Sequence, residues 1–287
     1  MDHPLKPVGL ERRERIGSEK RKIGSQNMAR MLPWTPTPQY GGEPQPNIFA
    51  PDLSLMAMED SYCDMWDRTE VIDLRIRSLF NVSLMVGVGN VTNPFEIGFH
   101  APGAIANGAS VRDLEAIATI SRAYIGSPAS GWAMMTMVQA LKDRGLYPDT
   151  FPPANVARKE AKGSEKRAVA RDVLRKMDPQ SALIDVPEGE MDASIFAPEL
   201  DYMILENCVW DIWGRSDDVD LRTKTVIVLG LLMGLGNLEE LAEFVPIAKA
   251  NGITRVEFEE FVYQAATYLG YPTGKRLRRT IGNALKA

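Results

Sequence analysis

The sequence of 287 residues contains one unit twice. The run Ile-Phe-Ala-Pro-Asp-Leu at residues 48–53 returns at residues 195–200 with a single change, Glu for Asp. The same spacing aligns further identities: Met56/Met203, Glu59/Glu206, Asp64/Asp211, Trp66/Trp213, Arg68/Arg215, and Asp-Leu-Arg at residues 73–75 and 220–222. A period of roughly 145 residues is a whole domain, because solenoid repeats have only about 20–50 residues. We therefore expect two similar domains that pack pseudo-symmetrically, as a homodimer would.

Beyond residue 90 the first copy is slightly longer, and the alignment then resumes with Glu96/Glu240, Pro102/Pro246, Tyr124/Tyr268 and Pro128/Pro272. Helix signals occur at matching places in both copies. Aspartates that precede long apolar stretches, and capping boxes further on, predict helix starts. These capping residues are Asp73, Ser110 and Asp113 in the first copy and Asp220, Thr254 and Glu257 in the second. Two pairs of glycines, Gly87/Gly89 and Gly234/Gly236, are expected to end the long helices.

Shorter helices are predicted at about residues 95–106 and 239–250, and Pro128 and Pro272 suit the first turn of a final helix. The pentapeptide Gly-Ser-Glu-Lys-Arg occurs twice and predicts one more helix at the start of each unit. Because no alternating strand pattern is present, we predict an all-α fold built from two tandem helical bundles. We place the first domain at residues 1–148, the linker at 149–162 and the second domain at 163–287. The linker begins with a proline-rich stretch.

Composition excludes several classes of function. The net charge is -5 and the isoelectric point is near 5.3, so we expect no nucleic acid or membrane partner. The longest apolar run, residues 226–235, is far shorter than the ~20 residues that cross a bilayer. Two cysteines cannot form a disulfide framework and no secretory signal is present, so a cytoplasmic protein is expected. With only His3 and His100 available, no metal site is predicted.

An ordered series of short motifs resembles the carboxymuconolactone decarboxylase family. The second copy carries Glu-Asn-Cys-Val-Trp-Asp-Ile-Trp at 206–213, Asp-Leu-Arg-Thr-Lys at 220–224, Ala-Asn-Gly-Ile-Thr at 250–254 and Ala-Ala-Thr-Tyr-Leu-Gly-Tyr-Pro at 265–272. The first copy matches with Trp66, with Asp-Leu-Arg-Ile-Arg at 73–77, and with Glu96 followed by His100 and Asn-Gly at 107–108. The resemblance covers nearly the whole chain from about residue 48, apart from the segment between the copies.

This resemblance implies an all-helical bundle of the type shared with alkylhydroperoxidase D-like proteins. Single-domain members form trimers or hexamers, so a tandem chain is expected as a homo-oligomer, either a trimer that makes a pseudo-hexamer or a dimer. Decarboxylases of the family need no cofactor. The implied activity is therefore a cofactor-free lyase that acts by proton transfer on a small carboxylated or lactone-type metabolite.

The family pattern places a glutamate before the Cys-Trp segment and a histidine on the short helix. Only the first copy has both, Glu59 and His100, so we expect His100 to transfer a proton and Glu59 to orient or receive it. A possible secondary site comprises Glu206 and Cys208, while Phe244 stands where a second histidine would fall. Weaker candidates for substrate binding are Arg75, Ser61 and Trp66.

Simpler interpretations stay open at each of these positions. His100 could be an ordinary core residue, and Glu59 and Glu206 could be structural carboxylates that pair with Arg75 and Arg222. A non-catalytic oligomeric scaffold or binding protein is the main alternative function. Thiol peroxidase chemistry through Cys208 is a weaker alternative, because the Cys-x-x-Cys pair of the related hydroperoxidases is absent.

Overall fold

The computed structural model describes residues 10–34, 51–89, 94–189, 194–215 and 219–286. All regular elements within these ranges are helices, and no strand occurs among them, which confirms the predicted all-α class. None of the described helices combines the length and apolar character that a membrane crossing requires.

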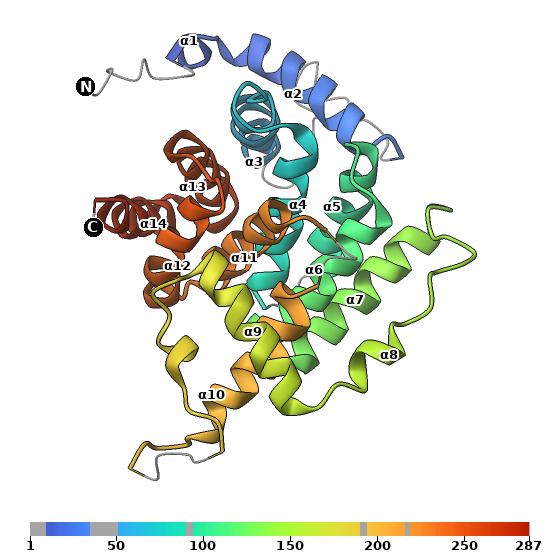
Figure 1. Ribbon diagram of the computed structural model, residues 1–287. Coiled ribbons are helices and arrows are strands. Elements are labelled where there is room, and N and C mark those ends of the chain that lie inside the picture. The colour runs from blue at the N-terminus through green and yellow to red at the C-terminus, as the bar shows by residue number, and fades with distance from the viewer. Residues whose placement is uncertain (1–9, 35–50, 90–93, 190–193, 216–218, 287) are drawn as a thin grey trace.

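Matching series of helices follow one another in the two halves of the chain (Figure 1). The first half contains α1 (Leu10–Arg13), α2 (Gly17–Met31), α3 (Pro51–Met56), η1 (Ala57–Met65), α4 (Leu74–Gly87), α5 (Pro94–Ala106), α6 (Val111–Ile125) and α7 (Ser127–Lys142). The second half contains α8 (Val156–Lys159), α9 (Gly163–Met177), η2 (Ala182–Asp185), α10 (Glu199–Ile204), η3 (Leu205–Trp213), α11 (Leu221–Leu235), α12 (Leu238–Ala250), α13 (Arg255–Leu269) and α14 (Tyr271–Ala284). Helix α8 lies within the predicted linker and was not expected.

The predicted caps are confirmed. The Asp73 carboxylate accepts a hydrogen bond from the backbone N–H of Ile76, and Asp220 does the same for Thr223. Both capping boxes are complete, one at the start of α6 and one at the start of α13. Each cap satisfies backbone donors that a helix leaves unpaired at its N-terminus, which explains why these boundaries could be predicted from sequence.

Helices α4 and α11 lie side by side at the centre of the bundle and make the most extensive contact between any two elements (Figure 1). Glycine makes this close approach possible. A Cβ atom on Gly230 would lie 2.7 Å from the Phe80 carbonyl oxygen, and one on Gly234 would lie 2.3 Å from that of Leu84. The prediction that Gly87 and Gly234 serve as helix ends is therefore incomplete. Gly89 and Gly236 have the positive φ of helix ends, whereas the other two pack the central helices together.

Two long π-helical stretches, η1 and η3, occupy equivalent places in the two halves. Each has nine residues and directly continues a short α-helix. π-Helical segments are rare, usually extend for only a single turn, and are frequent at functional sites. The capping and periodicity signals in the sequence did not indicate them, although η1 and η3 contain Glu59 and Glu206.

Charged side chains form buried ion pairs between the two halves of the chain. Arg77 is fully buried in α4, and its guanidinium bonds the Glu260 carboxylate of α13 at 3.0 Å. Arg68 donates from Nε to both Glu260 oxygens, at 3.0 and 2.9 Å. Because an unpaired buried charge is costly, this network requires both halves to be in place.

Candidate functional site

His100 lies on α5 with only 5% of its surface exposed. Its Nε2 is 3.4 Å from the Oε2 atom of Glu96, one helical turn earlier. The bond from His100 lowers the pKa of Glu96, and this outweighs the opposing effect of burial. The Glu96 side chain is about one-third exposed, so this carboxylate links the buried imidazole to the protein surface.

Two aromatic side chains flank the imidazole, one from each half of the chain. The Trp66 ring stacks on it with a centroid distance of 6.1 Å and an interplanar angle of 8°. The Tyr268 ring from α13 meets it edge-on at 5.4 Å. The indole Nε1 of Trp66 donates a hydrogen bond to the Tyr268 hydroxyl at 2.9 Å. The second half therefore contributes directly to the surroundings of His100.

Burial raises the pKa of Tyr268 well above the usual value for tyrosine, and the nearby Tyr62 phenol adds to this shift. Tyr268 thus keeps its proton at neutral pH. Asn81 lies near Tyr268 and acts to lower the pKa of its hydroxyl. Neither polar atom of the fully buried Asn81 amide makes a hydrogen bond in the described structure. A buried amide without hydrogen-bond partners costs about 1–3 kcal/mol, so Asn81 lowers the stability of the fold.

A second cluster occupies the equivalent place in the other half and is less polar. Trp213 donates from Nε1 to the Tyr124 hydroxyl at 3.2 Å, which mirrors the bond between Trp66 and Tyr268. Phe244 stands at the aligned position of His100, and its ring lies 5.9 Å from that of Trp213. Val228 stands at the aligned position of Asn81 and is fully buried. The aligned replacements are both apolar.

Cys208 adjoins this second cluster. Burial raises the pKa of its thiol to about 11, and the Glu240 carboxylate contributes to the rise. Reactive cysteines have lowered pKa values, because the thiolate is the nucleophile. The surroundings of Cys208 therefore favour the protonated, unreactive form.

The predicted glutamates have partners that sequence reasoning missed. Arg21 bonds Glu59 at 2.5 Å, and Arg167 bonds Glu206. The pairing of these carboxylates with Arg75 and Arg222 is wrong, since both arginines instead bond the acidic members of the capping boxes, Asp113 and Glu257. The signal was present in the sequence, because Arg21 and Arg167 close the duplicated Gly-Ser-Glu-Lys-Arg motif.

The structure therefore brings His100 and Trp66 together but joins Glu59 to α2 rather than to the imidazole. Ser61 lies half-buried in η1, where its backbone carbonyl accepts from the Trp66 N–H at 3.0 Å. A cavity of about 420 Å³ opens elsewhere, between α6 and α7, and neither His100 nor Glu59 lines it. Over the described parts of the chain, no three His, Cys, Asp or Glu side chains converge in a way that could hold a metal ion.

A scan of the sequence against models of known protein families finds no match, and a search of the curated proteins finds no relative.

Proposed function

We propose that the protein is a cofactor-independent carbon–carbon lyase that decarboxylates a small carboxylated or lactone-type metabolite, with His100 as the proton donor. The observation that carries this proposal is the buried His100–Glu96 pair between Trp66 and Tyr268. Buried polar groups are costly, and the aligned cluster in the other half has apolar Phe244 instead. A buried imidazole present in only one of two aligned clusters is expected where that cluster performs chemistry.

In the proposed reaction the bond between the carboxylate carbon and the substrate framework breaks, and carbon dioxide leaves. The electron pair of that bond moves toward the conjugated carbonyl of the substrate. The imidazolium of His100 then donates its proton to the carbon framework, which completes the exchange of carboxyl for hydrogen. Glu96 lies against the imidazole Nε2 and provides a route for a new proton from solvent, since its carboxylate is partly exposed.

Glu59 has a positioning role in this proposal. Its bond to Arg21 fastens α2 to η1, the segment that precedes Trp66. Arg75 is held in the same way by Asp113, at 2.5 and 3.2 Å, so the structure gives it a partner other than substrate. Glu206 and Cys208 have no proposed role in the reaction.

The same proposal includes the tandem arrangement and assembly. Reciprocal bonds between Trp66 and Tyr268 and between Trp213 and Tyr124 support two bundles of the carboxymuconolactone decarboxylase type packed pseudo-symmetrically. Association of the chain into a trimer or dimer is supported by apolar side chains that both halves expose at aligned positions. These are Leu53 and Met56 in α3 and Leu200 and Met203 in α10. We also propose a cytoplasmic location.

The test is carbon dioxide release from carboxylated lactones and β-keto acids by the purified protein. His100→Gln should reduce release by about 100-fold or more, which is the usual contribution of a positioned proton donor. Phe244→Leu, the matched change in the other cluster, should retain it, and Glu59→Gln should stay within a few-fold of the parent. Equal release by the His100 variant would exclude this site. No release from any compound by the folded protein would exclude decarboxylation of these substrates and favour the non-catalytic alternative.

A further inference from the structure

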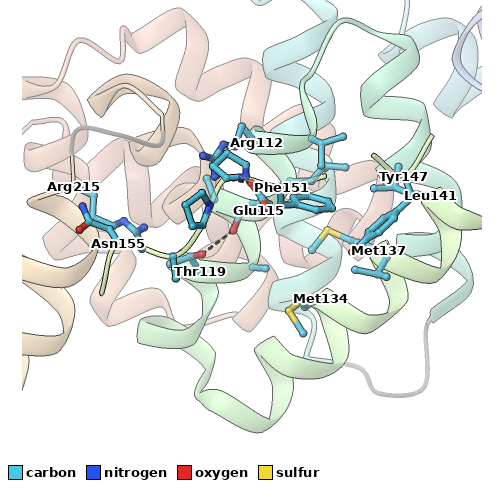
Figure 2. A pocket seen from close by; sticks show the side chains of 18 residues that line it. Arg112, Glu115, Thr119, Met134, Met137, Leu141, Tyr147, Phe151, Asn155 and Arg215 are labelled. Carbon is cyan, nitrogen blue, oxygen red and sulfur yellow. Dashed lines mark hydrogen bonds and ion pairs between the residues drawn. The ribbon is translucent and has the colours of Figure 1, made fainter. Parts of the chain in front are cut away.

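The cavity between α6 and α7 is covered by the segment that follows α7, residues 147–155 (Figure 2). Its volume of about 420 Å³ lies within the range of about 300–1,000 Å³ typical of small-molecule sites. Most of this covering segment belongs to the predicted linker between the two copies. The linker therefore forms one wall of a cavity as well as joining the two halves.

The backbone of the covering segment is weakly held. None of its N–H groups donates to a backbone carbonyl of a described residue, and Pro148, Pro152 and Pro153 have no N–H to donate. Regions with few buried contacts and few backbone hydrogen bonds open at a small cost in free energy. The covering segment can therefore move to admit a ligand while α6 and α7 stay intact.

Most side chains that line the cavity are apolar. Leu114 of α6 and Met134 and Met137 of α7 line its floor, and methionine adapts readily to the shape of an apolar ligand. The Tyr147 and Phe151 rings of the covering segment also line it, with a centroid distance of 5.1 Å between them. This surface suits an aromatic or alkyl body.

The charged side chains and the amide of the lining already have partners within the protein. Arg112 bonds Glu115 at 3.0 Å, and the Thr119 hydroxyl donates to the Glu115 backbone carbonyl at 2.9 Å. The Asn155 side chain caps α8 by accepting from a backbone N–H of its first turn at 3.1 Å. Arg215 is likewise engaged in an interaction of its own. A charged ligand would thus lose its hydration without meeting an unpaired charge, which is unfavourable.

The polar and the apolar side chains lie toward different ends of the cavity. Figure 2 places Arg215 and Asn155 toward one end, and Tyr147, Leu141 and Met137 toward the other. A ligand body at the second end would contact apolar side chains and leave the existing polar contacts in place.

We propose that this cavity binds an uncharged small molecule with an aromatic or alkyl body, which lies between α7 and the covering segment. The site is separate from the proposed lyase site, because none of the residues that line it belongs to the His100 cluster. Its test therefore does not depend on carbon dioxide release.

Fluorescence titration of the full chain with N-phenyl-1-naphthylamine tests the proposal, because this uncharged probe becomes brighter in apolar surroundings. We expect saturable binding of one probe per chain. The anionic probe 1-anilinonaphthalene-8-sulfonate has the same rings and adds a sulfonate, so it should bind about tenfold more weakly or worse. No saturable binding to the folded protein, or an affinity for the anionic probe equal to or above that for the uncharged one, would overturn the proposal.

Two variants with matched controls place the probe in this cavity. Ala118→Phe fills the cavity from α6 and should weaken binding of N-phenyl-1-naphthylamine about tenfold or more, whereas Ala123→Phe, at an exposed position of the same helix outside the cavity, should not.

Phe151→Ser removes an apolar side chain of the covering segment and should also weaken binding. Phe95→Ser is its control, because Phe95 is an exposed ring that contacts one other ring and lies outside the cavity. Circular dichroism reports whether each variant is folded. Unchanged affinity in both cavity variants would mean that the probe binds elsewhere and would also overturn the proposal.

Discussion

The indole of Trp66 donates its N–H to the hydroxyl of Tyr268 across the boundary between the two halves of the chain. The Trp66 side chain is almost fully buried, so no solvent is available to replace this bond. Trp213 and Tyr124 make the same bond in the opposite sense. Each half thus provides a tyrosine hydroxyl that accepts a hydrogen bond from a buried indole N–H of the other half.

Tyr268→Phe should destabilise the protein by about 1–3 kcal/mol, since it leaves the Trp66 N–H buried without an acceptor. The same change should lower carbon dioxide release, because the Tyr268 hydroxyl holds the Trp66 ring that stacks on His100. Tyr124→Phe is the matched control, and we expect a similar loss of stability without a loss of activity. Urea unfolding and product release measured on both variants separate the two effects. Equal activity losses would mean that Tyr268 acts only through the fold.

Glu96 and Glu240 occupy aligned positions, but we expect removal of their charges to have different effects on the stability of the fold. His100 lowers the pKa of Glu96, so its ionised form stabilises the fold above the unfolded pKa near 4.5, and this stability is lost as the pH falls through the folded value. Burial raises the pKa of Glu240, and the neighbouring Glu243 adds to the rise, so its ionised form is unfavourable in the folded state.

Glu96→Gln should therefore lower the Tm at pH 7, with a difference from the parent that shrinks below about pH 4.5. Glu240→Gln should leave the Tm at pH 7 unchanged or raise it. Thermal unfolding of the three proteins between pH 3 and pH 8 gives the comparison. A loss at pH 7 in the Glu240 variant as large as that in the Glu96 variant would contradict the assigned environments.

Cys208 should react slowly with iodoacetamide. Burial raises the pKa of its thiol to about 11, so little thiolate exists at pH 8. We expect a rate at least about tenfold below that of the same cysteine in the urea-unfolded chain, because each unit of pKa changes the thiolate fraction about tenfold. Mass spectrometry of alkylated peptides measures both rates. Rapid modification of Cys208 in the native protein at pH 7 would favour the alternative of thiol peroxidase chemistry.

The close contact of α4 with α11 predicts the effect of adding one methyl group. Gly230→Ala should destabilise the protein by about 1–3 kcal/mol, the usual cost of overpacking a core. Its Cβ would meet the Phe80 carbonyl oxygen at 2.7 Å, and backbone cannot move aside as a flexible side chain can. Gly131→Ala in α7 is the control, since its Cβ would have no atom of the described residues within 4 Å apart from its chain neighbours and its own helix backbone. That change should be neutral or stabilise by up to about 1 kcal/mol. Chemical denaturation distinguishes the two outcomes.

Sequence reasoning succeeded where the interactions are local. The caps at Asp73 and Asp220 join residues three positions apart, so helix starts and the all-α class could be predicted. The π-helical stretches η1 and η3 could not be predicted, because they have no distinct capping or periodicity signal in the sequence. The link between Glu59 and Arg21 was missed because its partners are on different helices, although both are duplicated.

The site was predicted only in part for the same reason. His100 was singled out by its motif and by its absence from the second copy. Tyr268 could not be predicted, since its proximity to His100 arises from the packing of α13 against η1 and α4. Glu96 lies four positions before His100 in the sequence, but the family pattern predicts Glu59 as the partner of the histidine, whereas the structure places Glu96 there.

The crossed bonds between tryptophan and tyrosine have a consequence for how such a protein can change over generations. In an assembly of two identical chains, a substitution that alters one cluster alters both at once. A chain that carries the unit twice is free of that constraint: it can keep Phe244 in one cluster and His100 in the other. Joining the copies in one chain allows two related surroundings to specialise separately while each continues to hold the other in shape.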